Sequence, residues 1–234
     1  MAVKEASLPY AYPCDTYMET ILSNVLVRKT LQLVVKRYCK GEIRTIIAES
    51  QKVTAKSYPR LYSLVEDCKC TLGIKEKLEV YVTGRLGGIN ALTIGTDEEP
   101  IVLISRKALV SLTDGELKFL IGHELGHVQQ KNLVCHTLKG ILDEWTDSSE
   151  ILGKVVADMI DVPLKQWHRC SEYTADRAGI ICCKDINIVS SLFNKVSSVS
   201  EKEDPTAELF ELTQAHPLYG HRIKELKTYI GTDL

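Results

Sequence analysis

The sequence predicts an α+β fold that is mainly α-helical. Segments with apolar residues at three- and four-residue steps dominate the chain, and three short segments rich in β-branched residues follow one another near its middle. The chain has 234 residues, of which 44% are hydrophobic and 26% charged, so it can bury one sizeable core. It contains no internal repeat and no low-complexity tract, which favours a single globular unit.

Two helices are predicted before the strands. Residues 20–55 repeat apolar side chains at helical spacing, with lysine and arginine between them. A second helix is expected to begin at Pro59 and end near Gly73, because proline favours the first turn of a helix and glycine its end. Both helices are expected to serve as scaffold.

The predicted strands are 78–84, 89–95 and 100–105. The segments RLGG and TDEE separate them, so a small antiparallel sheet is expected. A short helix, KALVSL, follows, and Thr113 and Glu116 then have the spacing of a capping box. The helix that begins there is expected to run through Lys131.

The rest of the chain is predicted to be helical. Residues 137–161 have the pattern of a pair of amphipathic helices, and Pro163 is expected to start another. Two further helical patterns are INIVSSLFNKVSSV and PLYGHRIKELKTYI, and the charged segment 200–208 between them is expected to form a loop.

Charge and hydropathy argue against several classes of partner. The formal net charge is -2 and neither sign dominates, so nucleic acid is not expected as a partner. The N-terminal residues lack the apolar core of a secretory signal, and every apolar run stops well before the roughly 18 residues that a membrane span requires. We therefore expect a soluble, cytoplasmic protein with no transmembrane segment. In such a reducing compartment the eight cysteines are expected to be free thiols.

The strongest chemical signal is the segment IGHELGHVQQ, residues 121–130. On a helix, His123 and His127 lie on one face with Cβ atoms about 6 Å apart, so both imidazoles can bind a single ion. Glu124 is rotated away from these two ligands but stays close to the ion, where its carboxylate can accept a proton from attacking water. The alternative is a charged helix that carries two histidines by chance.

A catalytic zinc site normally has three protein ligands, so a third one is expected elsewhere in the chain. The metzincin pattern is absent, because Gln130 and Leu133 stand where its glycine and histidine belong. Three other candidates are expected to be exposed: His136, Glu144 and Glu150.

Glu172, in the segment SEYTADRAG, is the best candidate for the third ligand. Asp176 lies one helical turn later, so one carboxylate can bind the metal while the other accepts the free N–H of a ligating imidazole. The alternative is a pair of solvated acids balanced by Arg177.

With HELGH followed by EYTAD, the chain resembles the gluzincin metallopeptidases that include the CAAX prenyl proteases and the heat-shock protease HtpX. The segments INALTIG, TDGELKFLIGHELGHV and HPLYGHRI resemble further motifs of this family in the same order. The resemblance covers roughly residues 60 to 228. It implies a zincin-like metalloprotease domain in which the edge strand of the sheet lies over the zinc helix.

We assign residues 1–58 to an N-terminal segment and helix that pack on this catalytic domain, and residues 59–234 to the domain itself.

The resemblance also implies the roles of individual residues. It makes His123, His127 and Glu172 the ligands of one Zn²⁺ per chain, and Glu124 the general base. The remaining roles go to residues that support the ligands (Asp176 and Arg222), stabilise the oxyanion (His216) and align the substrate backbone (Asn90 and Ala91).

The sequence differs from the membrane-bound members of this family in the segment between the two ligand helices. Those members often carry membrane-spanning helices in this segment. Seven charged residues occupy that interval here: Lys139, Asp143, Glu144, Asp147, Glu150, Lys154 and Asp158. These charges argue against a spanning helix. We therefore predict a soluble zinc-dependent endopeptidase that acts on polypeptides, and leave a peripheral membrane contact and the oligomeric state open.

A non-catalytic alternative is a zincin-fold binding or chaperone-like protein. A latent form of the same site is also conceivable, in which the N-terminal segment covers the metal and the Cys14 thiolate caps it. Because the sequence retains Glu124, the non-catalytic alternative is disfavoured, whereas the latent form stays open. An aminopeptidase is disfavoured, because the chain lacks the Gly-x-Met-Glu-Asn type of element that holds a substrate amine in such gluzincins.

Overall fold

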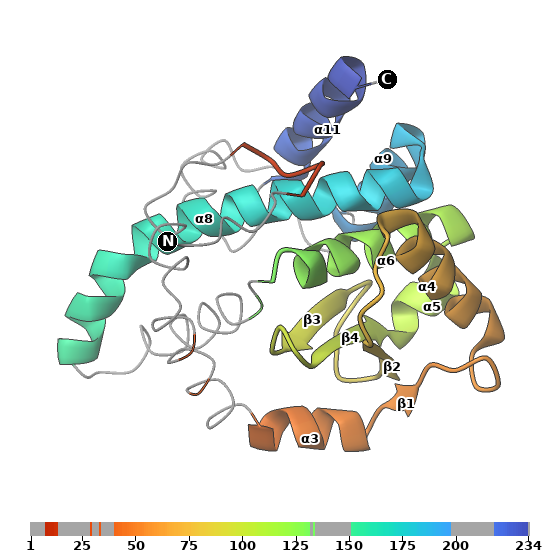
Figure 1. Ribbon diagram of the computed structural model, residues 1–234, viewed down its shortest axis with the longest axis horizontal. Coiled ribbons are helices and arrows are strands. Elements are labelled where there is room, and N and C mark those ends of the chain that lie inside the picture. The colour runs from red at the N-terminus through yellow and green to blue at the C-terminus, as the bar shows by residue number, and fades with distance from the viewer. Residues whose placement is uncertain are drawn as a thin grey trace.

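A computed structural model of the chain describes residues 8–13, 29, 33, 40–131, 133, 151–197 and 218–233. Helices form most of this part of the chain, and a small four-stranded sheet lies beside them (Figure 1). The predicted α+β, mainly helical fold is therefore confirmed.

The sheet is mixed, with the strand order β1-β2-β4-β3. Its strands are β1 (Gln51–Lys52), β2 (Glu79–Thr83), β3 (Ala91–Gly95) and β4 (Pro100–Ser105). The pairs β1–β2 and β3–β4 are antiparallel, but β2 and β4 run parallel. The predicted antiparallel sheet is therefore wrong for its central pair of strands.

A tight hairpin between β3 and β4 explains the parallel pair. Gly95 has a φ of 107°, and Thr96 and Glu99 exchange backbone hydrogen bonds of 3.4 and 3.1 Å, so the chain reverses at once. A Cβ atom at Gly95 would lie 2.4 Å from the backbone oxygen of Glu99, so the turn requires glycine. The returning strand β4 inserts between β2 and β3, which leaves β3 at the edge of the sheet.

The first predicted helix is shorter than expected. Helix α3 (Lys40–Ala48) lies within it, but the chain forms β1 soon after Ala48, so the prediction of helix up to residue 55 is wrong. The Val53 N–H donates to the Val80 oxygen over 2.8 Å, and the Val53 side chain is buried in the core. Pairing with β2 thus outweighs the helical periodicity of the sequence here.

The helices around the strands follow their sequence signals closely. Helix α4 (Pro59–Leu72) ends at Gly73, which adopts the left-handed conformation with φ 70°. Helix α5 (Arg106–Ser111) is followed by α6 (Asp114–Gln129), whose start carries the predicted capping box. Helix α6 ends two residues before the expected Lys131, because that residue takes a positive φ of 52°.

One long helix replaces the two that were predicted around Pro163. Helix α8 (Ile151–Cys183) runs through Pro163 without a break, so the prediction that this proline starts a helix is wrong. A proline removes one backbone hydrogen bond from a helix, but α8 continues beyond it and packs along α6. Residues 137–150, which include the first half of the predicted amphipathic pair, lie outside the described residues.

Helices α9 (Ile186–Ser197) and α11 (Tyr219–Asp233) confirm the last two helical patterns. In Figure 1, α6 lies between the sheet and α8, and α11 lies on the far side of α8. Across the described ranges, every helix is too short or too polar to span a bilayer.

The cysteines differ in part from expectation. Cys68, Cys70, Cys182 and Cys183 are free, whereas Cys170 is disulfide-bonded. The prediction that all eight cysteines are free thiols is therefore wrong for Cys170. That prediction rested on the cellular compartment, whereas a disulfide depends on which sulfur atoms the fold brings together.

Helices α6 and α8 pack with almost no side chain between their backbones. A Cβ atom at Gly126 would lie 2.9 Å from the Cα atom of Ala175, and one at Gly122 would lie 3.0 Å from the backbone oxygen of Ala178. Both alanines are fully buried. The two helices approach this closely because glycines face alanines.

Substitution of Gly126 by alanine should destabilise the fold. The added methyl group would push α6 away from α8, and overpacking of this kind lowers the free energy of unfolding by about 1–3 kcal/mol. The matched control is Gly220→Ala on α11, where a Cβ atom meets nothing within 4 Å, so stability should be unchanged or slightly higher. Urea denaturation of both variants measures this, and wild-type stability of Gly126→Ala would contradict it.

A buried glutamate joins the start of α6 to α9. The Glu116 carboxylate accepts hydrogen bonds from the Thr113 N–H at 2.8 Å, the Ser191 hydroxyl at 2.9 Å and the Lys195 ammonium at 2.7 Å. Burial acts to raise the pKa of Glu116, but Lys195 and these hydrogen bonds outweigh it, so the pKa lies below its usual value. Glu116 therefore contributes to stability in its ionised form.

Replacement of Glu116 by glutamine should lower stability mainly at neutral pH. Because the pKa is lowered in the folded state, the carboxylate contributes stability above its unfolded-state pKa of about 4.5, and this contribution is lost as the pH falls through the folded-state pKa. The variant should lose about 1–2 kcal/mol of unfolding free energy at pH 7, and the loss should shrink toward about pH 4. Denaturant titrations of both proteins across this range test the prediction, and a loss that does not vary with pH would argue against it.

Candidate active site

Two helices and one strand provide the residues of the site. Helix α6 carries His123, Glu124 and His127, and helix α8 carries Glu172 and Asp176. All five side chains are buried, which is unusual for ionisable groups unless they are paired or bind a metal ion.

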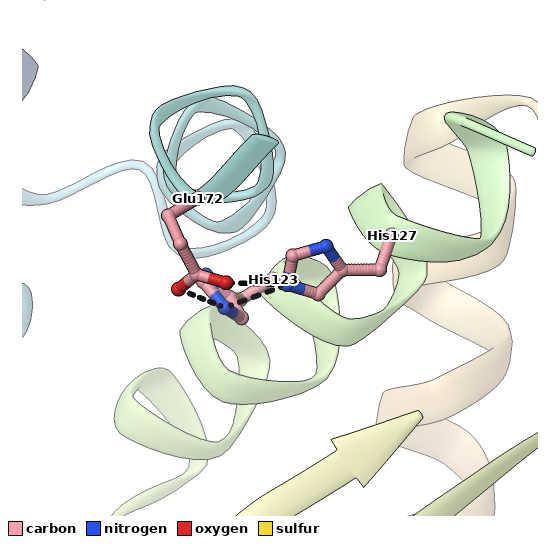
Figure 2. Close-up of side chains that lie close together, drawn as sticks. All are labelled: His123, His127 and Glu172. Atoms are coloured by element: carbon pink, nitrogen blue, oxygen red, sulfur yellow. Dashed lines mark hydrogen bonds and ion pairs between the residues drawn. The ribbon is translucent and has the colours of Figure 1, made fainter. Parts of the chain in front are cut away.

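The two histidines and Glu172 converge on one point (Figure 2). The Nε2 atoms of His123 and His127 lie 3.2 Å apart. The Glu172 carboxylate lies 3.3 Å from His127 Nε2 through Oε1 and 3.6 Å from His123 Nε2 through Oε2. Tetrahedral zinc with bonds of about 2.0–2.1 Å separates its ligand atoms by about 3.3 Å, so this donor set fits such an ion. In the part of the chain that the structure describes, these three residues form the cluster that could hold a metal ion.

Asp176 and Arg222 fix the orientation of His123. Asp176 Oδ1 lies 2.9 Å from His123 Nδ1, and Arg222 donates to both Asp176 oxygens over 2.8 and 2.5 Å. Burial acts to raise the pKa of Asp176, but the Arg222 guanidinium and His123 outweigh it, so the pKa lies below its usual range. An ionised carboxylate can only accept hydrogen bonds, so His123 Nδ1 carries the proton and Nε2 directs its lone pair toward the other ligands.

The environment of His127 is negatively charged. Burial acts to lower the pKa of His127, but Glu172, Glu124 and Asp176 outweigh it and raise the pKa. The His127 Nδ1 atom lies 3.5 Å from the Ser171 hydroxyl, which itself donates to Gln130 over 2.7 Å. Converging carboxylates of this kind favour a bound cation.

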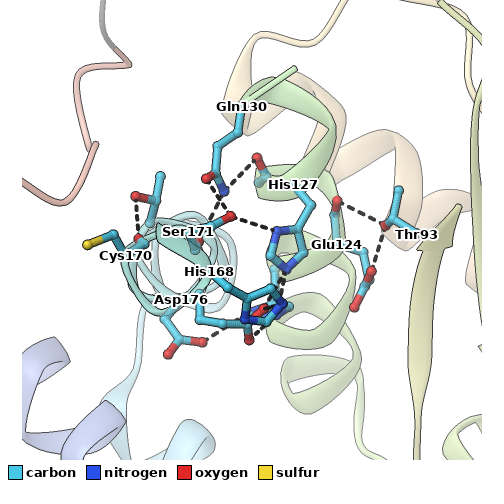
Figure 3. Close-up of polar contacts among 12 residues, drawn as sticks. Thr93, Glu124, His127, Gln130, His168, Cys170, Ser171 and Asp176 are labelled. Atoms are coloured by element: carbon cyan, nitrogen blue, oxygen red, sulfur yellow. Dashed lines mark hydrogen bonds and ion pairs between the residues drawn. The ribbon is translucent and has the colours of Figure 1, made fainter. Parts of the chain in front are cut away.

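Glu124 is held by the sheet rather than by another helix. The Thr93 hydroxyl on β3 lies 2.6 Å from Glu124 Oε2 and 3.3 Å from the Glu124 backbone oxygen. In Figure 3, Thr93 and Glu124 lie on one side of His127, and Ser171 and Gln130 lie on the other. The carboxylate that was predicted to be the base is thus beside the ligands without belonging to the cluster.

A cavity of about 440 Å³ opens over the site. Asn90, Ala91, Leu92 and Thr93 on and beside strand β3 form part of its wall, as do His123, Glu124, His127, Glu172 and Arg222. Apolar side chains of α6 and α9 form another part of the wall: Phe119, Leu120, Leu192, Phe193 and Val196. The cavity therefore combines a polar base with apolar walls, as ligand sites commonly do.

The structure brings together most of the residues that the sequence singled out. Asn90 and Ala91 line the cavity, and Arg222 contacts Asp176. Arg177, by contrast, donates to the Ala11 oxygen over 2.9 Å and lies over the Tyr12 ring, so the alternative in which it balances two solvated acids does not apply. The predicted residues His216 and Cys14 lie outside the described residues, as do His136, Glu144 and Glu150.

Sequence reasoning overlooked two cavity residues. His168 is buried, lines the cavity and places its Nε2 atom 3.7 Å from Glu172 Oε1. Its position four residues before Glu172 was a usable signal, because residues at this spacing share a helix face. Thr93 had no such signal, since its contact with Glu124 joins a strand to a helix.

Comparison with known proteins identifies the family. The family model described as Peptidase family M48 matches residues 55–230. The chain belongs to this family. The match covers strands β2, β3 and β4, both ligand helices and Arg222, and it confirms the resemblance drawn from the HELGH and EYTAD motifs.

Individual relatives share about a quarter of their aligned residues with the chain. It is 28% identical over 109 residues to plastoglobule-localized metallopeptidase 48, chloroplastic, of Arabidopsis thaliana, an alignment that covers 46% of this chain and 32% of that protein. It is 24% identical over 180 residues to a protease HtpX homolog of Methanopyrus kandleri, covering 67% of this chain and 57% of that protein. A protease HtpX homolog of Halobacterium salinarum is 28% identical over 123 residues, covering 51% and 41%. The chain thus spans only a third to somewhat over half of these relatives.

Removal of the Glu172 carboxylate should weaken metal binding. The Glu172→Gln variant keeps the shape of the side chain but offers a neutral ligand, and zinc affinity should fall by at least about 100-fold, since even residues outside the ligand set typically contribute 10–100-fold. Glu66→Gln, at an exposed position of α4, is the matched control. Zinc content after dialysis against a weak chelator measures the effect. Equal zinc retention by both variants would remove Glu172 from the ligand set.

Proposed function

We propose that this chain is a zinc-dependent endopeptidase that hydrolyses peptide bonds of polypeptide substrates, with Glu124 as the general base. One observation carries the proposal: a buried carboxylate stands beside a donor set of two imidazoles and one carboxylate, at the base of a cavity with an edge strand in its wall. Membership of Peptidase family M48 supports the same reaction. The cytoplasmic location remains a prediction.

Zinc suits the donor set better than the other common divalent ions. Two imidazole nitrogens and one carboxylate oxygen at near-tetrahedral spacing are typical of catalytic zinc sites, whereas magnesium and calcium prefer six or more oxygen ligands. His123, His127 and Glu172 would hold the ion. Zinc bound there would supply Lewis acidity toward a water molecule and toward the carbonyl group of the scissile bond.

Glu124 would move the proton in this reaction. Its Oε1 atom would accept a proton from the attacking water molecule as the new C–O bond forms. The same carboxyl group would then return the proton to the nitrogen of the leaving amine as the C–N bond breaks. The predicted role of His216 is to stabilise the oxyanion between these two steps.

The edge strand β3 is suited to bind the substrate backbone. The Ser105 N–H donates to the Asn90 oxygen over 2.9 Å, so the main chain of Asn90 faces β4. Because such bonds alternate along an antiparallel pair, Ala91 and Thr93 direct their N–H and C=O groups toward the outer edge. An extended peptide could pair with these groups as an added strand. We therefore propose that Ala91 binds the substrate through its main chain and that Asn90 contributes its side chain.

Replacement of Glu124 by glutamine should abolish peptidase activity but preserve the fold. Glutamine has the same shape and cannot accept the proton, and loss of a general base typically lowers kcat by about 10²–10⁴-fold. Zinc content and thermal stability should stay close to those of the wild type. Cleavage of an unfolded protein substrate measures activity, with Glu66→Gln as the control. Undiminished cleavage by Glu124→Gln would falsify the proposed role of the base.

A further inference from the structure

We infer that Thr93 is a positioning residue for the base, and that its hydroxyl group ties Glu124 to the strand along which the substrate would lie. The inference rests on the proposed role of Glu124. It goes beyond that role because it identifies what orients the carboxylate.

The Thr93 hydroxyl group donates its hydrogen bond to the side chain of Glu124 rather than to the backbone oxygen of that residue. The Thr93 hydroxyl carries a single proton and lies 2.6 Å from Glu124 Oε2 but 3.3 Å from the Glu124 backbone oxygen. The shorter distance is typical of an O–H donor on a carboxylate, so the proton points at Oε2. Both side chains are buried, so little of either is exposed to water molecules that would compete for this hydrogen bond.

The geometry leaves one carboxylate oxygen for chemistry. Oε2 of Glu124 is engaged by Thr93, so Oε1 is the oxygen that can face a water molecule in the cavity. The last torsion of a glutamate side chain has a broad energy profile, and without the hydroxyl group the carboxylate would sample many orientations. Because the β-branched Thr93 side chain has few rotamers, it is a rigid anchor.

Thr93 also stands at the edge of the sheet that faces the cavity. Its backbone N–H and C=O groups point to the outer side of β3, while its side chain points to α6. A peptide paired with β3 would therefore be held by the same residue that orients the base. This arrangement would keep the distance between the scissile bond and Oε1 nearly constant, which is what an oriented base requires.

A pair of substitutions in the full-length chain separates this role from packing. Thr93→Val keeps the shape of the side chain and removes the hydroxyl group, whereas Thr93→Ser keeps the hydroxyl group. We expect kcat for a peptide substrate to fall about 10- to 100-fold in Thr93→Val and to stay within a few-fold of the wild type in Thr93→Ser, with KM changed little in either. Zinc content and melting temperature should match the wild type in both variants.

A buried threonine elsewhere in the same sheet provides the control. Thr83 on β2 is fully buried and does not contact Glu124, so Thr83→Val should leave kcat unchanged per mole of folded, zinc-loaded protein. A comparable loss of kcat in Thr83→Val would mean that the loss of any buried hydroxyl group explains the effect, and would overturn the inference.

The test also distinguishes failure of this inference from failure of the proposed function. If Glu124→Gln cleaves like the wild type, the proposed function is wrong and Thr93 loses its role with it. If Glu124→Gln is inactive but Thr93→Val retains the wild-type kcat, only the positioning role is wrong. In the Glu124→Gln background, adding Thr93→Val should cause no further loss of residual activity. A further loss there, or a parallel loss of zinc in Thr93→Val, would assign Thr93 a purely structural role.

Discussion

The close contact between helices α6 and α8 is the constraint on which the site depends. Gly126 faces Ala175 and Ala178, so the two backbones approach with only the methyl groups of alanine between them. His123 and His127 project from one helix and Glu172 from the other beside this contact, which brings their ligand atoms within 4.8 Å of one another. A larger residue at Gly126 would widen this spacing and draw the carboxylate away from the imidazoles. The glycine of HELGH is therefore as necessary to the geometry as its histidines.

Charge is the second constraint, and it connects the site to a third helix. Asp176 and Glu172 are buried beside the guanidinium group of Arg222 on α11, and both act on His127 together with Glu124. Arg222 compensates Asp176 directly, because it donates to both of its oxygens. A divalent cation held by His123, His127 and Glu172 would compensate the negative charge of these buried carboxylates. A metal ion that bound this folded site but not the unfolded chain would therefore stabilise the fold.

The spacing of residues along the sequence correctly predicted which side chains share a face of the same helix. The two histidines of HELGH and the two acids of EYTAD share helix faces because each pair lies four residues apart, and the same rule would have found His168. It could not predict features that depend on contacts between distant segments. The parallel pair of strands follows from the position of the β3–β4 hairpin, and the disulfide at Cys170 from the approach of two sulfur atoms. The continuous helix through Pro163 shows that a local signal for a helix start does not by itself break a longer helix.

The edge position of β3 would link substrate binding to catalysis in the proposed peptidase. A free sheet edge invites pairing with any extended chain, and proteins commonly protect such edges. Here residues 90–93, on and beside this edge, line the wall of the cavity that His123, His127 and Glu172 also line. In the proposed peptidase, a peptide bound to this edge would lie beside α6, and the Thr93 hydroxyl extends from the same strand to Glu124 (Figure 3). Displacement of β3 would therefore disturb backbone recognition and base orientation together. Because β3 forms the hairpin with the buried strand β4, the core of the sheet would fix both the groups that pair with a peptide and the orientation of Glu124.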